Sequence, residues 1–543
     1  MPPRLHGSAI AFTLLLAVAG VARADEPLHE RIDALIAAGQ PDNGPHAAPP
    51  ASDAEFLRRV YLDLNGTIPT ANEARAFLAD GSPDRRAQLI DRLLAQPAYA
   101  RRLAQHFDAT LMERRRDAKV PRDAWEEFLR TSFAQNKPYD QLVREILSAD
   151  GTDPKNRGPA KFYLDRDFEP TVVARDVGRL FLGRDLRCAQ CHDHPLVDDY
   201  KQEQFYGLLA FLNRSYLFPN AMSATAVVAD KADGEVTFVS VFDPAKKQHS
   251  TGPRLPGGAP VAEPKPEKGK EYKVAPAANV RPVPTYSRRE QLAGAVTDPR
   301  NRAFARTAAN RLWALMFGRG LVHPLDLDHP GNPPSHPELL DLLTDEFTAH
   351  HFDVQWLLRE LALTNTYQRS SEAPGDRADA PPDRYLSAAL KPLTPEQLAF
   401  AILQATGQAD AERLALGKNA AAAAVDAKLA PRLAAIRATF TGRPAEPEDP
   451  AEATLAQALF LKYGGVVRGA IAARPGNLVD RLSKLADADA VADELFVSVL
   501  SRAPTDEERR DVASALAGAA DRPAALAEVV WALLASAEFR FNH

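Results

Sequence analysis

The chain of 543 residues carries 66 Lys and Arg against 72 Asp and Glu, a formal net charge of −6. This balance gives no basic surface for phosphates and disfavours nucleic-acid binding. Hydrophobic residues (45%) and charged residues (25%) occur in the proportions of an ordinary globular protein, and length alone allows three or four domains. Because the chain has only two cysteines, disulfides cannot be its main source of stability.

Residues 1–24 have the pattern of a secretory signal. Arg4 supplies the positive start, residues 9–21 form an apolar stretch, and the Ala-Arg-Ala of residues 22–24 is a cleavage site. The apolar run is short for a bilayer, which takes about 20 residues, and no later stretch is long and apolar enough. We therefore expect a protein cleaved near Ala24 and exported to the periplasm or outside the cell, with no integral membrane segment in the mature chain.

The part of the chain before the cysteines repeats apolar residues at intervals of three and four, which is the helix period. Ser52 with Glu55, and Thr70 with Glu73, have the spacing of capping boxes at helix starts. Gly183 is expected to end the last helix of this run. We interpret the basic cluster at residues 114–116 as a solvated helix face.

Cys188, Cys191 and His192 then form a C-x-x-C-H pattern. This is the pattern of covalent c-type haem, in which both cysteines form thioether bonds to the haem vinyl groups and the histidine is the proximal iron ligand. His194 and Asp193 are secondary candidates that orient the motif or lie at the haem edge. The candidates for a sixth ligand, by residue type alone, are Met222, His106 and His249.

Other uses of the two cysteines stay open. A redox dithiol is expected after a strand, whereas this motif follows a helical pattern. A zinc site with His192 and His194 would compress four ligands into seven residues, and neighbours such as Cys191 and His192 rarely reach one tetrahedral ion together. A small Cys188–Cys191 disulfide is the third possibility.

Residues 235–242 alternate β-branched and aromatic side chains, which predicts a strand, with Val227 and Val228 as its partner. Residues 252–285 carry eight prolines and read as a linker. The predicted fold is mainly α, with two helical domains, a small β element at about residues 225–245 and a Pro-rich linker. The predicted boundaries are a signal peptide at 1–24, a helical domain at 25–250, a linker at 251–286 and a second helical domain at 287–543.

In the second domain, residues 321–336 form a loop rich in residue types that bind metals. Its candidates are His323, Asp326, Asp328, His329 and His336. They lack a recognisable ligand spacing, so a metal site there is an alternative only. Ser335 is expected to cap the following helix, with Glu338 as its reciprocal partner.

Several phrases resemble a known family. Residues 56–69, 181–195 and 205–208 are similar to the planctomycete cytochrome-associated domain family (PSCyt type). Residues 310–321 and 332–340 resemble the companion domain that usually follows it (PSD type). Both are of unknown function, and the resemblance implies haem through the cytochrome in the family's label. His323 stands where an acidic residue is usual.

Three functions follow as hypotheses. The first is an exported protein that binds one haem c and passes electrons to a redox partner. The second is a scaffold of the cell envelope in which the cysteines form a disulfide, and the third is a metal-binding protein or hydrolase that uses the 323–336 loop. No phosphate loop or serine elbow occurs, so we expect no nucleotide cofactor, and whether the protein is an enzyme stays open.

Overall fold

The computed structural model describes residues 26–40, 46–220, 225–372, 380–417, 421–441 and 454–543. Helices dominate these residues, and every sheet in them has two strands. The prediction of a mainly α fold is therefore confirmed. No helix in the described ranges is long and apolar enough to cross a bilayer. The signal peptide predicted at 1–24 lies outside the described residues.

The first part of the chain is a series of packed helices. They are α1 (Leu28–Ala38), α2 (Asp53–Asn65), α3 (Ala71–Leu78), α4 (Arg85–Leu94), α5 (Pro97–Met112), α6 (Arg122–Ala134), α7 (Tyr139–Ser148), α8 (Lys161–Leu164), α9 (Pro170–Leu182) and α10 (Gln202–Leu212). The capping box at Thr70 and Glu73 is present. At Ser52 only half of the predicted box forms: its Oγ accepts a hydrogen bond from the amide of Glu55, whereas the Glu55 carboxylate pairs with Arg59. Gly183 ends α9 with φ +67°, a left-handed conformation that suits glycine.

Short strands follow α10. They are β1 (Ser215–Asn220), β2 (Thr225–Asp230), β3 (Val236–Phe238), β4 (His249–Thr251), β5 (Tyr272–Val274) and β6 (Val283–Pro284). The strand expected near 235–242 exists as β3, but its predicted partner is wrong. Val228 lies in β2, which pairs antiparallel with β1, whereas β3 pairs with β4. Alternation predicts a strand but not which neighbour completes its hydrogen bonds.

The remaining elements are again mostly helical. They are α11 (Arg288–Val296), α12 (Arg302–Phe317), α13 (Pro337–Ala349), α14 (Val354–Leu363), β7 (Lys391–Pro392), α15 (Pro395–Ala405), α16 (Gln408–Leu416), α17 (Ala422–Phe440), α18 (Leu455–Tyr463), α19 (Gly465–Ile471), α20 (Leu478–Ser483), α21 (Ala488–Leu500), α22 (Asp506–Leu516), α23 (Arg522–Ala535), α24 (Ala537–Arg540) and β8 (Phe541–Asn542). The expected cap at Ser335 is wrong: α13 begins one residue later, with His336 at its N-cap and no side-chain cap bond. Ser335 Oγ instead lies 3.1 Å from Nδ1 of His336.

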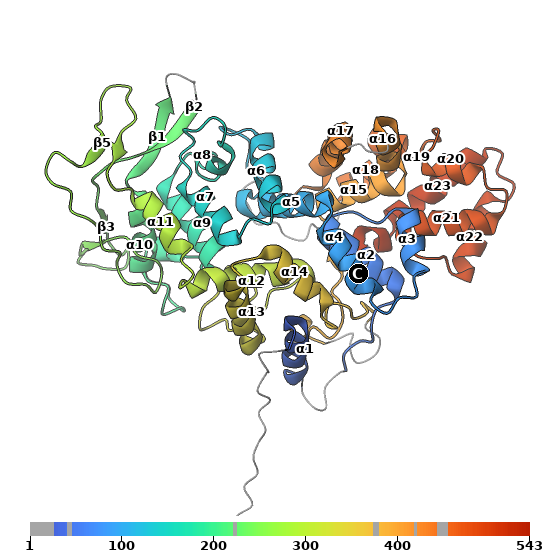
Figure 1. Cartoon of the computed structure of the whole chain (residues 1–543), viewed down its shortest axis with the longest axis horizontal. Coiled ribbons are helices and arrows are strands. Elements are labelled where there is room, and N and C mark those ends of the chain that lie inside the picture. Colours follow the sequence, from blue (N-terminus) through green and yellow to red (C-terminus); the bar gives the residue numbers. More distant parts are fainter. Residues whose placement is uncertain (1–25, 41–45, 221–224, 373–379, 418–420, 442–453) are drawn as a thin grey trace, which may run out of the picture.

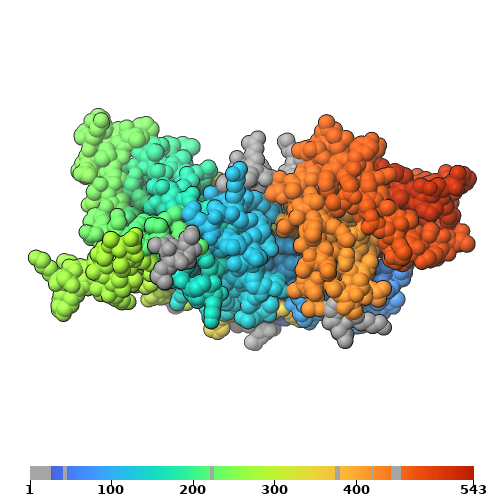
Figure 2. Space-filling model, turned by 90° about the horizontal axis from the view of Figure 1, so that it is seen from above, coloured from blue at the N-terminus to red at the C-terminus, as the bar shows by residue number. Residues whose placement is uncertain are grey.

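The buried apolar side chains of the described residues form two clusters. The larger runs from α1 to Tyr385, with Val497 of α21 added, and includes residues on both sides of the Pro-rich segment, and the smaller joins α15–α24 to Leu62 and Ile68. Figure 1 shows two lobes, with α7–α11, β1–β3 and β5 on the left and α15–α23 on the right, and Figure 2 shows the elongated shape from above. The predicted domain boundary at 251–286 stays a prediction. The two apolar clusters divide the chain at a later point than this linker.

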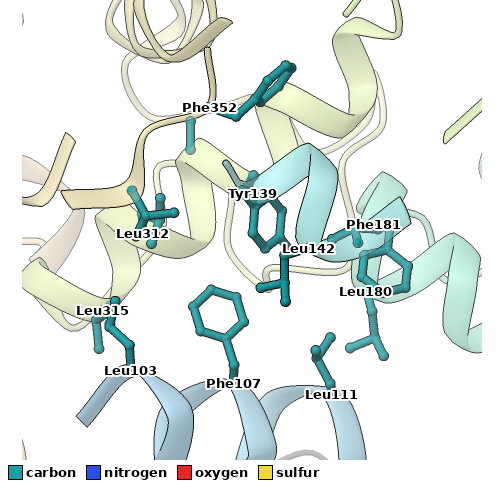
Figure 3. Packing of buried hydrophobic residues seen from close by; sticks show 14 of the residues in the cluster. Leu103, Phe107, Leu111, Tyr139, Leu142, Leu180, Phe181, Leu312, Leu315 and Phe352 are labelled. Carbon is teal, nitrogen blue, oxygen red and sulfur yellow. The ribbon is translucent and has the colours of Figure 1, made fainter. Parts of the chain in front are cut away.

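Helix α5 organises the larger cluster. Figure 3 shows its side chains, Phe107 among them, facing Tyr139 and Leu142 of α7, Leu180 of α9 and Leu312 of α12. The rings of Phe107 and Tyr139 lie 5.6 Å apart, within the range at which aromatic pairs attract. Helix α5 is therefore fixed between helices of both halves of the chain.

Candidate functional site: the C-x-x-C-H motif and the central cavity

The two cysteines lie one turn apart on a short 3₁₀ helix (Cys188–Gln190) that follows α9. The amides of Cys191 and His192 donate to the carbonyl of Cys188, over 3.2 and 3.4 Å. Both cysteines are exposed and free. This tight turn brings the two thiols to one short segment of the surface, where a second molecule can reach both.

The proton position on His192 follows from its hydrogen bond. Its Nδ1 lies 2.7 Å from the carbonyl oxygen of Asp193. Because a carbonyl only accepts, Nδ1 must carry the proton and donate it. In the neutral ring Nε2 is then the unprotonated nitrogen, with its lone pair available to a metal, and a backbone carbonyl of this kind commonly orients a ligating histidine.

Three hydrogen bonds fix the motif to its neighbours. The hydroxyl of Tyr206 in α10 donates to the carbonyl of Gln190 over 3.0 Å, and the amide of Val241 donates to the carbonyl of Cys191 over 3.0 Å. Asp193 Oδ1 accepts from the amide of Gln202, the first residue of α10, over 2.9 Å. Asp193 therefore stabilises a helix start, where a carboxylate also meets the positive end of the helix dipole.

Exposed apolar side chains gather around the motif. We call them the apolar rim, and they are Leu196 (87% exposed), Phe242 (74%), Val241 (65%) and Val239 (39%). The ring of Phe242 lies 4.6 Å from that of His192. Contiguous exposed apolar groups of this kind usually mark a binding surface. Free thiols, an available imidazole nitrogen and this apolar rim together fit a covalently held haem.

The other haem candidates occupy different positions. His194 orients its own turn, because its Nδ1 accepts from the amide of Leu196 and its amide donates to the carbonyl of Tyr200. His249 in β4 stacks on Phe238, which in turn stacks on Tyr206 beside the motif. His106 lies on α5, and Met222 lies outside the described residues. The choice of sixth ligand stays open.

The second candidate, the loop at 323–336, does not gather its ligand types. Asp326 pairs with Arg179 and Arg311, and Asp328 pairs with Arg306. In the described part of the chain, no group of three or more His, Cys, Asp or Glu side chains is placed to hold a metal ion.

This loop nevertheless lies against the segment that leads to the cysteines. The amide of Asp185 donates to the carbonyl of Asp326 over 2.8 Å, and the amide of Asp328 donates to the carbonyl of Gly183 over 2.9 Å. The ring of His329 meets that of Tyr200 at 5.4 Å. The two candidate sites, more than a hundred residues apart in sequence, are therefore neighbours.

A cavity of about 1140 Å³, which we call the central cavity, lies beside them. Its walls come from α5, α9, α12, the residues 323–327, the segment around β7 and the chain end at β8. Arg187, which directly precedes Cys188, lines it together with His323. Burial lowers the pKa of His323, and the nearby Arg319 adds to this effect.

Sequence reasoning missed this cavity. Arg115 lines it, and Arg114 makes a bidentate pair with Glu396 over 2.6 and 2.9 Å, so the solvated helix face expected at 114–116 is wrong for these two residues. The local signal was a cluster of arginines, but their partners lie in distant segments that no local pattern reveals.

Comparison with known protein families identifies two regions of the chain. Residues 31–216 match the PSCyt2 model, described as a protein of unknown function (DUF1549), and residues 288–516 match the PSD1 model, described as a protein of unknown function (DUF1553). The chain therefore contains a PSCyt2 region followed by a PSD1 region. This confirms the resemblance inferred from the sequence. No curated protein and no solved structure matches the chain.

The two family regions share the central cavity. The PSCyt2 region contributes α5 and α9 and also holds the C-x-x-C-H motif, and the PSD1 region contributes α12, the 323–327 residues and β7. Residues 540–542 line the cavity from beyond the PSD1 match. The cavity therefore forms where the two regions meet, and neither region would form it alone.

Proposed function

We propose that this protein is exported and attaches one haem c through Cys188 and Cys191, with His192 as the proximal iron ligand, for electron transfer. The observation that carries the proposal is the hydrogen bond made by Nδ1 of His192. Its Nδ1 proton is held by a backbone carbonyl, which leaves Nε2 free beside two exposed thiols on the same turn.

The chain supplies what covalent attachment needs. Each thiol adds across one vinyl double bond, so that sulfur bonds to one carbon and the thiol hydrogen passes to the other. This addition consumes no oxidant, but it requires both cysteines to be reduced and accessible. The exposed, unpaired positions of Cys188 and Cys191 support this requirement. Export matches this chemistry, because the C-x-x-C-H pattern is used outside the cytoplasm.

The apolar rim has a defined role in this proposal. Leu196, Val241 and Phe242 expose large side chains beside the motif, where a flat apolar group could cover them. A bound haem supplies reversible one-electron chemistry at its iron. The rim would exclude water from the haem face, and water exclusion is one of the means by which a protein sets a haem's potential.

The test is expression in an exporting host, with and without a haem-attachment system. We expect purified protein with a Soret band that stays with the polypeptide after acid–acetone extraction, and a mass increase of one haem only when the attachment system is present. Cys188→Ala combined with Cys191→Ala should abolish both signals, whereas His350→Ala, which changes an exposed histidine at the end of α13, should leave them intact.

The remaining hypotheses give different results in the same preparation. A colourless protein whose thiols resist alkylation until they are reduced would support an envelope scaffold with a Cys188–Cys191 disulfide. A colourless protein with one bound metal ion that is lost in variants of the 323–336 loop would support the metal-dependent alternative. Either result would overturn the haem proposal.

A further inference from the structure

The central cavity is large and has walls of mixed character. Its volume of about 1140 Å³ slightly exceeds the usual range for small-molecule sites, roughly 300–1,000 Å³. Apolar side chains such as Leu180, Leu315 and Phe541 line part of it. A simple ion would fill only a small part of this volume, so the cavity suits a ligand with an organic framework.

Charged side chains line the rest, and basic ones are in excess. Among the described residues, eight Arg and Lys face five Asp and Glu in the cavity lining. Each of the five carboxylates already has a basic partner. The pairs are Asp63 with Lys391, Glu113 with Arg179, Asp176 with Arg166, Asp185 with Arg187, and Asp326 with Arg311.

Two lining arginines are left without a carboxylate. In the described part of the chain, neither Arg175 of α9 nor Arg540 of α24 has an ion pair or a side-chain hydrogen bond, and the Nε of Arg540 is buried with no acceptor. A buried guanidinium donor without an acceptor costs free energy, and an anionic oxygen is the acceptor that it binds best. The two arginines approach the cavity from opposite halves of the chain.

The titration of His106 agrees with a positive local potential. This histidine of α5 also lines the cavity, and its pKa falls from its usual 6.5 to about 3. Burial is the main cause, and the positive charges of Arg102 and Arg311 add to it. The chain as a whole carries a net charge of −6, so the positive field is local to the cavity and not a general property of the surface.

We propose that the central cavity binds an organic polyanion, a molecule of sugar size or larger with three or more phosphate, sulfate or carboxylate groups, which Arg175 and Arg540 contact directly. The excess of basic groups sets the charge, the volume sets the size, and the apolar wall receives the uncharged framework. Guanidinium groups suit all three anions because their planar fork can donate two parallel hydrogen bonds. This site does not include the two thiols, and the proposal applies whether or not haem is attached.

The experiment is isothermal titration calorimetry on the full chain at 150 mM NaCl. Three probes separate the anion chemistries, namely inositol hexakisphosphate, sucrose octasulfate and citrate, and sucrose is the uncharged control. We expect at least one probe to bind with micromolar Kd and sucrose not to bind. Arg175→Gln and Arg540→Gln should each weaken that binding about tenfold, and Arg175→Lys, which keeps the charge, should weaken it less.

Arg474→Gln is the matched control, because Arg474 is exposed and lies outside the cavity lining. It should change the Kd less than twofold. Circular dichroism confirms that each variant is folded, and the Cys188→Ala, Cys191→Ala protein should bind the probe as the unmodified chain does. The proposal is overturned if no probe binds below millimolar concentration, or if Arg474→Gln weakens binding as much as the cavity variants. Binding that disappears once haem is attached would also overturn it, since the arginines would then serve the haem carboxylates.

Discussion

Nζ of Lys391 lies 2.7 Å from Oδ1 of Asp63, a carboxylate on α2 that is only 2% exposed. The same carboxylate accepts from the hydroxyl of Tyr367 and from the side-chain amide of Asn542, each over 2.8 Å. Burial lowers the pKa of Lys391, and the attraction of Asp63 opposes this shift. One buried carboxylate thus joins α2, β7 and β8 at the wall of the central cavity.

We expect Asp63→Asn to destabilise the fold by about 3–5 kcal/mol, because it leaves the ammonium of Lys391 buried without its counter-charge. Lys391→Met should also destabilise it. The double variant should lose less stability than the two single variants lose in sum, because neither charge is then buried without its partner. Urea denaturation followed by tryptophan fluorescence measures these differences, and strict additivity of the two losses would contradict the coupling.

Two glycines within helices should respond in opposite ways to alanine. A Cβ on Gly207 of α10 would clash with Cγ of Arg254 and lie 3.1 Å from its carbonyl oxygen, so the Pro-rich segment would have to shift. A Cβ on Gly294 of α11 meets nothing within 4 Å. We expect Gly207→Ala to lower the thermal midpoint and Gly294→Ala to raise stability by about 0.5–1 kcal/mol, the helix preference of alanine over glycine. Equal effects in differential scanning calorimetry would argue against the close approach of Arg254.

The apolar rim should affect the proposed haem. In the haem-bearing protein, Leu196→Ser with Phe242→Ser would admit water to the haem, which favours the oxidised state with its greater charge. We expect the midpoint potential to fall by an amount on the order of tens of millivolts. Leu414→Ser, which changes an exposed leucine of α16 in the other lobe, is the control and should have no effect. A spectroelectrochemical titration measures the shift, and an unchanged potential in the rim variant would separate the rim from the haem.

His106 should make stability depend on pH. Its pKa of about 3 in the fold lies below its usual 6.5, so the unfolded chain takes up more protons than the folded chain as the pH falls. The contribution of the neutral His106 to stability is therefore intact above about pH 6.5 and is progressively lost between pH 6.5 and pH 3. We expect the unmodified chain to lose about 1 kcal/mol more than His106→Gln between pH 7.5 and pH 5, after allowance for partial solvent contact. Urea midpoints at the two pH values measure this, and parallel losses would show that His106 is not responsible.

Local patterns in the sequence predict the local structure well. The N-cap at Ser52, the capping box at Thr70 and the helix end at Gly183 are found as expected, because each depends on residues within one turn of the chain. Ser335 failed as a cap for a physical reason. Its hydroxyl lies 3.1 Å from the ring nitrogen of His336, and the helix starts after that residue.

The sequence could not predict what distant segments build together. The C-x-x-C-H spacing pointed to the motif, but the apolar rim depends on Val241, whose amide bonds to Cys191 from fifty residues further along the chain. The central cavity is even harder to predict from the sequence. Arg175 and Arg540 are ordinary basic residues in their own helices. Within the described ranges they become a pair of charges without carboxylate partners only where the two halves of the chain meet.

The chain end at β8 lies beside α2, as Figure 1 shows, and Arg58 of α2 donates to the carbonyl of Phe539 over 2.8 Å. During synthesis, α2 is made long before Phe539 and Asn542, which its side chains contact. Until then Arg58 and Asp63 have no complete set of contacts, and such long-range closure is slow. A nascent chain that is passed unfolded across a membrane would avoid this waiting period, because α2 and β8 would then be present together when folding begins.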